Sequence, residues 1–161
     1  MRAWRGWMVM SDRLRSQVAR DLQADSGLSD ADYMVLVELS GAADHRVRMT
    51  DLAARLDWSK SRLSHQVGRM EARGLLRREE CPSDGRGAFA VLGDCGLTEI
   101  EQAAPNHVAS VRRHLIDLLD RDEVLQLGKI AGKVLEHLRG ESVCQEALAA
   151  VEGVEAPEGE G

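Results

Sequence analysis

Residues 49–92 constrain the fold most, because they contain a succession of short segments with different hydrophobic periods. Two segments with apolar residues every three or four positions come first, separated by the two-residue turn Asp57-Trp58. An alternating segment, a polar loop and a second alternating segment follow. These periods are typical of helices and of strands, respectively. The order therefore predicts a mostly α chain with a small β-hairpin wing, a winged helix-turn-helix.

The first predicted helix begins at Thr50, a residue that suits an N-cap, and has Leu52, Ala53 and Leu56 on one face. Ser59 is the predicted N-cap of the second helix. Two helices joined by so short a turn must cross at a steep angle.

In the second predicted helix, Leu63, Val67 and Met70 recur at helical spacing and should face the core. The opposite face is polar and cationic, with Ser61, Ser64, His65, Gly68 and Arg69. Such a face suits the major groove of DNA, where Ser and Arg side chains can reach base edges. The alternative is that these side chains only solvate an exposed helix face.

The segment that follows has the composition of a β-hairpin. Gly74 stands where a left-handed C-cap is expected. Residues 75–80 form the first predicted strand and include two arginines. Residues 82–87, Pro-Ser-Asp-Gly-Arg-Gly, have turn chemistry, and residues 88–92 form the second predicted strand.

The charge distribution favours a nucleic-acid partner. Residues 46–90 contain ten Lys or Arg and six Asp or Glu, whereas the whole chain has a net charge of -6. A cationic segment within an acidic protein is typical of a phosphate-binding face.

These residues resemble the MarR family of bacterial transcriptional regulators, and the resemblance extends over residues 4–139. The run WSKSRLSHQVGRMEARGLLRRE is similar to that family's recognition helix and following strand. The run CPSDGRGAFAVL is similar to its wing, with a D-x-R motif at Asp84 and Arg86. The resemblance implies that Arg86 enters the minor groove and that Asp84 holds the wing in shape. Gly93 departs from the family's usual Thr, and we expect it to loosen the strand end.

Pattern and resemblance together place the DNA contacts on the second helix and the wing. The predicted contact residues are Ser59, Lys60, Ser61, Arg62, Ser64, His65, Gln66, Arg69, Arg73, Asp84 and Arg86. An enzyme would need a convergent nucleophile, base and oxyanion donors, and the sequence contains no such set. The other alternative is a winged-helix module for protein partners, which would favour an acidic or apolar outer face.

The two ends of the chain are predicted to be helical, with apolar stripes too long to be buried on so small a central domain. Ser29 and Asp32 have the spacing of a capping box at the start of a helix, and Asp120-Arg-Asp is expected to break the long C-terminal helix. We expect a homodimer, as the resemblance also implies. The expected divisions are residues 1–28, an N-terminal dimerisation helix; 29–96, the DNA-binding domain; 97–140, C-terminal dimerisation helices; and 141–161, an acidic, disordered tail. A two-fold dimer predicts a pseudo-palindromic site with half-sites about 10 bp apart. Such a dimer is expected to act as a repressor by blocking polymerase.

The resemblance also implies a small aromatic or phenolic effector that relieves DNA binding. Candidate wall residues are Trp7, Met10, Tyr33, Met34 and Trp58, all of which also suit an ordinary core. An alternative is redox sensing through one of the three cysteines, Cys81, Cys95 and Cys144.

Neither the cysteines nor the histidines have metal-ligand spacing, so no metal or other cofactor is expected. The sequence has no apolar run long enough for a membrane span and no signal-peptide pattern at its start. We therefore expect a cytoplasmic protein.

Overall fold

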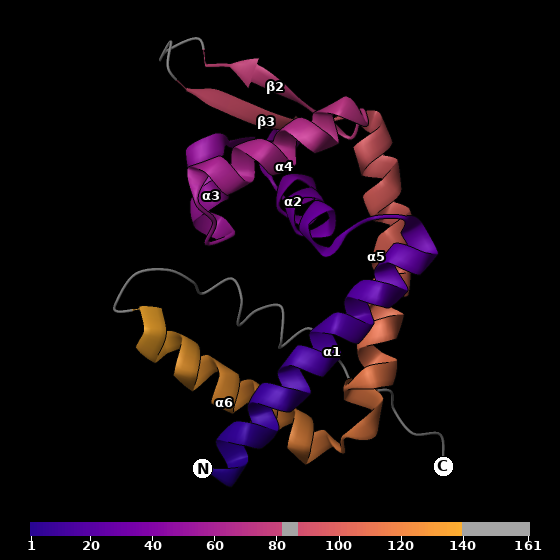
Figure 1. Cartoon of the computed structure of the whole chain (residues 1–161), viewed down its shortest axis with the longest axis vertical. Helices are drawn as coiled ribbons and strands as arrows, with labels where there is room; N and C mark the ends of the chain where they lie inside the picture. The colour runs from indigo at the N-terminus through magenta and orange to yellow at the C-terminus, as the bar shows by residue number, and fades with distance from the viewer. Residues whose placement is uncertain (82–86, 140–161) are drawn as a thin grey trace. The chain divides into compact units, whose positions relative to one another are not determined.

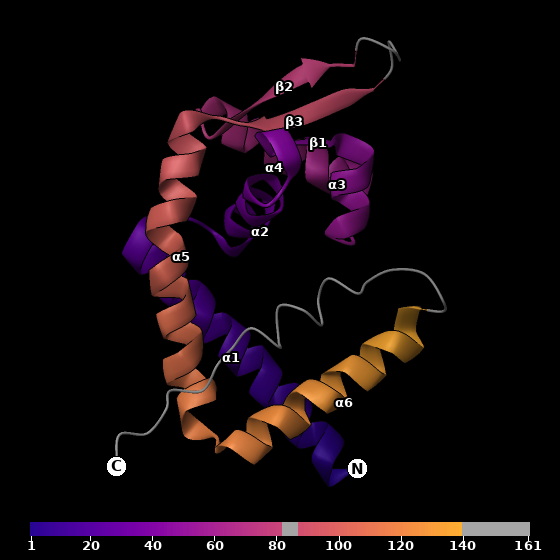
Figure 2. The same cartoon turned by 180° about the vertical axis from the view of Figure 1, so that it is seen from behind.

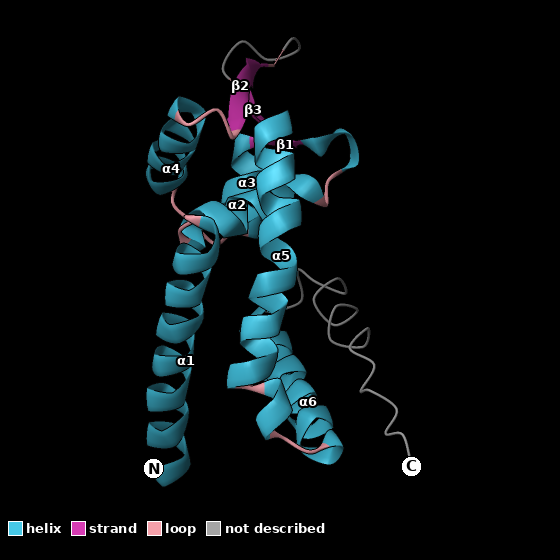
Figure 3. Cartoon of the chain, turned by 90° about the vertical axis from the view of Figure 1, so that its right-hand side faces the viewer, coloured by secondary structure: helices cyan, strands magenta, loops and turns pink. Residues whose placement is uncertain are grey.

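The computed structural model describes residues 1–81 and 87–139, and the chain divides into two compact units, 1–111 and 112–161. The elements follow the order of a winged helix-turn-helix with helices at both ends (Figures 1 and 2). They are α1 (Arg2–Ser26), α2 (Asp30–Ser40), the 3-10 helix η1 (Ala43–His45), β1 (Arg46–Arg48), α3 (Met49–Arg55), α4 (Lys60–Ala72), β2 (Leu76–Glu80), β3 (Ala88–Leu92), α5 (Asp94–His114), the 3-10 helix η2 (Ile116–Leu118) and α6 (Arg121–Arg139). Helices predominate, and the strands gather in one small sheet (Figure 3). The predicted fold class is confirmed.

The three strands form an antiparallel sheet in the order β1-β3-β2. Val47 of β1 and Arg78 of β2 both lie opposite Ala90 of the middle strand β3. The hairpin of β2 and β3 is the predicted one. The sequence pattern does not predict β1, because a three-residue segment with one apolar side chain has no visible alternation.

The helix-turn-helix differs from prediction at its first residue. Arg48 is the N-cap of α3 and makes no side-chain cap, so the prediction of Thr50 as N-cap is wrong. The turn passes through Asp57, which has a positive φ of 51°. Ser59 is the N-cap of α4, as predicted, and its Oγ accepts a hydrogen bond from the Arg62 backbone N–H at 3.2 Å.

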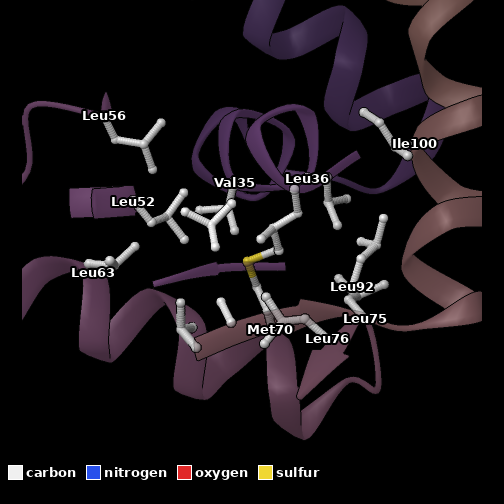
Figure 4. Packing of buried hydrophobic residues seen from close by; sticks show 14 of the residues in the cluster. Val35, Leu36, Leu52, Leu56, Leu63, Met70, Leu75, Leu76, Leu92 and Ile100 are labelled. Carbon is white, nitrogen blue, oxygen red and sulfur yellow. The ribbon is translucent and has the colours of Figure 1, made fainter. Parts of the chain in front are cut away.

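The core of the winged domain lies between α2, α3, α4 and the sheet (Figure 4). Leu63, Val67 and Met70 of α4 are buried, as predicted, and meet Leu36 of α2 and Leu52 of α3 within the same cluster. Burial of an apolar side chain of this size stabilises a fold by about 1.5–3 kcal/mol. The core therefore holds α4 firmly by one face and leaves the other exposed.

The junction between the wing and α5 is closely packed. Gly74 has φ 73°, which lets the chain turn from α4 into β2. The Gly93 N–H donates to the Leu75 carbonyl at 3.0 Å, and a Cβ on Gly96 would overlap that same carbonyl oxygen. Contrary to expectation, Gly93 does not loosen the strand end, because its backbone is hydrogen-bonded and α5 begins at the next residue.

The terminal helices are long, as predicted. In the first unit, α1 buries Val18 and Leu22, and the Ser110 hydroxyl of α5 donates to Asp21 of α1 at 2.7 Å. In the second unit, α6 begins after Asp120, whose carboxylate accepts the Glu123 N–H at 2.8 Å. The predicted helix break at residues 120–122 lies too late, since α5 ends at residue 114 and residue 120 opens the next helix. Among the described residues, none of the helices is long and apolar enough to cross a membrane.

Candidate nucleic-acid interface

The outer face of α4 is the most prominent polar surface that the sequence predicts. Eight of the predicted contact residues are exposed at the start of α4, along its outer side and at its C-cap: Ser59, Lys60, Ser61, Arg62, Ser64, His65, Arg69 and Arg73. Four of these eight carry a positive charge at neutral pH. The helix thus presents hydrogen-bond donors and cations to solvent, on the side opposite its buried core residues.

Gln66 is a correction, because the structure buries it instead of exposing it. Its side chain is 2% exposed, and its Nε2 donates to Asp32 Oδ1 of α2 at 2.6 Å. Its Oε1 accepts a hydrogen bond from Arg69 Nη2. Position 66 lies three residues after Leu63 and four before Met70, both in the core, so helical spacing could have placed it inward.

Asp32 is a functional candidate that the sequence interpretation missed beyond its capping role. Its carboxylate forms the predicted capping box with Ser29, accepting that residue's N–H at 3.0 Å and its hydroxyl at 2.7 Å. The same carboxylate accepts Arg73 Nη1 at 2.8 Å. Burial alone would raise the pKa of Asp32, but the hydrogen bonds from Arg73 and Ser29 outweigh burial and hold the pKa below its ordinary 3.8.

Arg62 is held by an aromatic neighbour. Its guanidinium carbon lies 4.2 Å from the centroid of the Trp58 ring. Trp58 itself is 9% exposed and belongs to the core cluster of the winged domain. Trp58 thus combines a place in the core with a stacking contact to Arg62, and its role as an effector-pocket wall stays a prediction.

The base of the wing completes the surface on the other edge of α4. Arg78 of β2 donates from Nη2 to the Ser64 carbonyl at 2.6 Å, and its own N–H donates to Glu71 at 2.9 Å. A hollow lies between α3, α4 and the wing strands, lined by Arg48, Met49, Thr50, Lys60, Leu63, Ser64, Arg78, Gly87 and Ala88. Three of these residues are cationic, so the hollow has the charge that an anion would need.

The strand β1 adds two further arginines beside the wing. The guanidinium carbons of Arg46 and Arg48 lie 3.9 and 5.2 Å from the centroid of the Phe89 ring. Arg46 also pairs with Glu79 at 3.6 Å, and Arg48 Nη2 donates to Cys81 Sγ at 3.2 Å. Neither arginine is among the contact residues predicted from the sequence, because the pattern of residues 46–48 does not indicate a strand.

Three predicted functional residues, Asp84, Arg86 and Cys144, lie outside the described residues. Of the other cysteines, Cys81 is buried and Cys95 is exposed. Within residues 1–81 and 87–139, there is no cluster of three His, Cys, Asp or Glu side chains that could hold a metal ion.

The remaining effector candidates do not line the hollow at the wing base. Trp7, Met10 and Met34 are exposed, whereas Tyr33 is partly buried and packs against His107 of α5 with ring centroids 4.3 Å apart. Burial raises the pKa of Tyr33. Burial also lowers the pKa of His107, an effect that the negative charge of Asp30 opposes.

Known proteins with similar sequences or structures are transcriptional regulators, most of them of the MarR family. A sequence model of the MarR family matches residues 26–87. The structure is similar to that of AbsC, a MarR family transcriptional regulator from Streptomyces coelicolor, with 50% identity and a TM-score of 0.80 over 86% of this chain and 93% of AbsC. It is also similar to Sco3205, a MarR family regulator from the same organism solved in complex with DNA, with 40% identity and a TM-score of 0.81 over 86% and 90% of the chains. The HTH-type transcriptional repressor YetL of Bacillus subtilis is 26% identical over 115 residues, which are 71% of this chain and 68% of YetL.

Proposed function

The chain belongs to the MarR family of DNA-binding transcriptional regulators, and we propose that it represses transcription as a homodimer on a pseudo-palindromic operator. The observation that carries this proposal is the exposed row of cations and hydroxyls on α4, held over a fully buried core face. The likeness to the DNA-bound Sco3205, at 40% identity, supports the same role for this surface. In this role α4 lies in the major groove and the wing reaches the adjacent backbone.

The contacts divide by chemistry. Arg62, Arg69 and Arg73, with Lys60, neutralise phosphates or reach guanine edges, whereas Ser61, Ser64 and His65 supply short donors and acceptors to the groove. At the wing tip, Arg86 enters the minor groove and Asp84 shapes the turn, as the family resemblance implies. Gln66 has no direct DNA contact in this proposal, since its side chain is buried.

A second copy of the chain supplies the rest of the functional unit. Exposed apolar side chains occur on both terminal helices: Trp4, Trp7, Met8, Val9 and Met10 on α1, and Leu125, Ile130, Val134, Leu135 and Leu138 on α6. So many large apolar side chains on a monomer's surface are typical of a buried interface. In this proposal residues 1–28 and 97–140 form the dimer, residues 29–96 bind DNA, and half-sites lie about 10 bp apart.

Relief by a small aromatic or phenolic effector is the proposed mode of control. The partly buried Tyr33 and His107 rings, with Met34 on the same helix as Tyr33, offer an aromatic and polarisable surface for such a ligand. A redox switch at Cys81 is less favoured, because that thiol is buried and already accepts a hydrogen bond from Arg48. A protein-binding module is less favoured, since the outer face of α4 is cationic.

The experiment is a DNA-binding titration of the full chain by fluorescence anisotropy. Duplex DNA from the region upstream of the protein's own coding sequence is compared with a scrambled duplex across a salt series. We expect tight, sequence-dependent binding at two chains per site. Equal and weak binding to both duplexes, together with failure to select a sequence from a random library, would contradict the proposal. Arg86→Ala should lower the slope of log affinity against log salt by about one if Arg86 meets a phosphate.

A further inference from the structure

One edge of α4 carries three arginines, and each is held by a different neighbour. Arg62 stacks on Trp58, Arg69 donates to Gln66, and Arg73 donates to Asp32. Positions 62, 66, 69 and 73 follow one another by three or four residues, so they share a stripe of the helix. The stripe lies between the buried face and the outer face of α4, where side chains can contact both the protein and a ligand.

The carboxylate of Asp32 is the centre of this arrangement. It accepts hydrogen bonds from four donors, which are the backbone and hydroxyl of Ser29, Nε2 of Gln66 and Nη1 of Arg73. Asp32 is 4% exposed, whereas the Arg73 side chain is 45% exposed. The buried carboxylate of Asp32 on α2 therefore restrains Arg73 at the end of the neighbouring helix α4, while the Arg73 side chain remains accessible to solvent.

The chemistry of these groups determines which way Gln66 points. An ionised carboxylate can only accept hydrogen bonds, so the Gln66 amide must turn its NH₂ group toward Asp32. Its carbonyl oxygen then faces the other way, where Arg69, which can only donate, supplies the partner. The charge on Asp32 thus orients Arg69 through an intervening amide, without touching it.

We propose that Asp32 is a positioning residue for DNA binding, which holds Arg73 directly and Arg69 through Gln66 in the conformations that meet phosphates. The inference rests on the proposed function. A restrained arginine loses less conformational freedom when it binds, so a phosphate contact made through it is stronger than one made by a free side chain. In this arrangement α2, which makes no predicted DNA contact, sets the strength of two contacts on α4.

The test compares Asp32→Asn with Asp30→Asn in the full-length protein. Both changes remove one negative charge from the start of α2, which by itself would strengthen binding to DNA. Asp30 is exposed, whereas Asp32 makes the network. Anisotropy titrations against the operator are run over a salt series, at a temperature well below the unfolding midpoint of each variant.

We expect Asp32→Asn to weaken binding about tenfold and to lower the salt slope by one to two, because each lost phosphate contact lowers it by about 0.9. Asp30→Asn should keep the wild-type slope.

A second variant separates positioning from stability. Gln66→Leu fills the same buried space and leaves the Asp32–Arg73 pair, but it removes the acceptor of Arg69. We expect it to lower the salt slope by about one. In an Arg69→Ala, Arg73→Ala background, Asp32→Asn should have little further effect on affinity.

The salt slopes of these variants decide whether Asp32 positions the two arginines. An unchanged salt slope in both Asp32→Asn and Gln66→Leu overturns the positioning role, even if both variants are less stable. So does an Asp32→Asn effect of the same size with and without the two arginines. A wild-type chain that shows no sequence preference for any DNA overturns the proposed function, and the positioning role with it. If Asp32→Asn does not fold, the slope of Gln66→Leu alone decides between support and refutation.

Discussion

The guanidinium of Arg62 lies over the ring of Trp58, with the two centres 4.2 Å apart. This pair joins an exposed cation to a side chain of the core, because Trp58 belongs to the buried cluster of the winged domain. Substitution of Arg62 should therefore affect mainly DNA binding, whereas substitution of Trp58 should affect mainly folding.

Replacement of Arg62 by alanine should weaken operator binding about tenfold and lower the salt slope by about one, with little loss of stability. Arg62→Lys keeps the charge but loses the planar group that stacks, so its affinity should be intermediate. Anisotropy gives the affinity, and urea unfolding of the free protein gives the stability. Binding as tight as wild type in both variants would remove Arg62 from the interface.

Trp58→Ala should act on the fold instead. A buried Trp reduced to Ala lowers the free energy of unfolding by about 3–5 kcal/mol. Urea unfolding followed by circular dichroism measures this loss. A loss below about 1 kcal/mol would show that packing of the Trp58 side chain contributes little to the stability of the core.

Gly96→Ala should destabilise the junction between the wing and α5, by about 1–3 kcal/mol, because its Cβ would overlap the carbonyl oxygen of Leu75. Gly6→Ala is the matched control. Gly6 lies inside α1 with nothing within 4 Å of an added Cβ, so this change should stabilise the helix by about 0.5–1 kcal/mol. Thermal unfolding of the two variants should therefore shift in opposite directions.

His107 should make stability depend on pH. Burial lowers its pKa below 6.5 in the folded chain, and its Nδ1 has no hydrogen-bond partner among the described residues. The unfolded chain therefore binds a proton more readily, and stability that is present above pH 6.5 is lost as the pH falls through the folded pKa. The nearby carboxylate of Asp30 reduces this effect.

The measurement is the urea midpoint of the free protein between pH 7.5 and pH 5. Wild type should lose stability on acidification, and His107→Gln should lose less. His65→Gln, which changes an exposed histidine of α4, serves as control and should follow the wild-type profile. An identical pH profile for His107→Gln and wild type would show that His107 does not cause the loss of stability at low pH.

Ile130→Asp should separate the proposed dimer. Ile130 is 59% exposed on α6, and a charge there is costly only if a second chain covers it. Sedimentation should show a shift toward monomer, with loss of cooperative operator binding. Lys129→Asp changes the neighbouring exposed residue and should remain a dimer. A dimeric Ile130→Asp protein would place the interface elsewhere.

The sequence predicts those parts of the fold in which local pattern and tertiary structure agree. The α4 core stripe of Leu63, Val67 and Met70, the Ser59 cap and the capping box of Ser29 are all as predicted, because each depends on residues within one or two turns. The strand β1 was not predictable in this way. Its hydrogen bonds come from β3, about forty residues later, and nothing within Arg46–Arg48 signals the pairing.

The candidate site shows the same division. Helical periodicity predicts the exposed cations of α4 and agrees with the burial of Gln66, but the hydrogen-bond partner of Gln66, Asp32, lies thirty-four residues earlier. A resemblance-based assignment gives every polar residue of the recognition helix the same role. The contacts of Asp32 with Gln66 and Arg73 become visible only in three dimensions, because no local sequence pattern links α2 to these positions of α4.

One residue, Gly93, separates the end of β3 from the start of α5, and its N–H and carbonyl are both hydrogen-bonded, to Leu75 and Leu97. There is consequently no slack at this point of the chain. A twist applied to the first turns of α5 would therefore reach β3, the middle strand of the sheet, because no loop lies between them. In the proposed complex with DNA, the angle of the wing would thus depend on the orientation of α5, a helix that lies outside the helix-turn-helix.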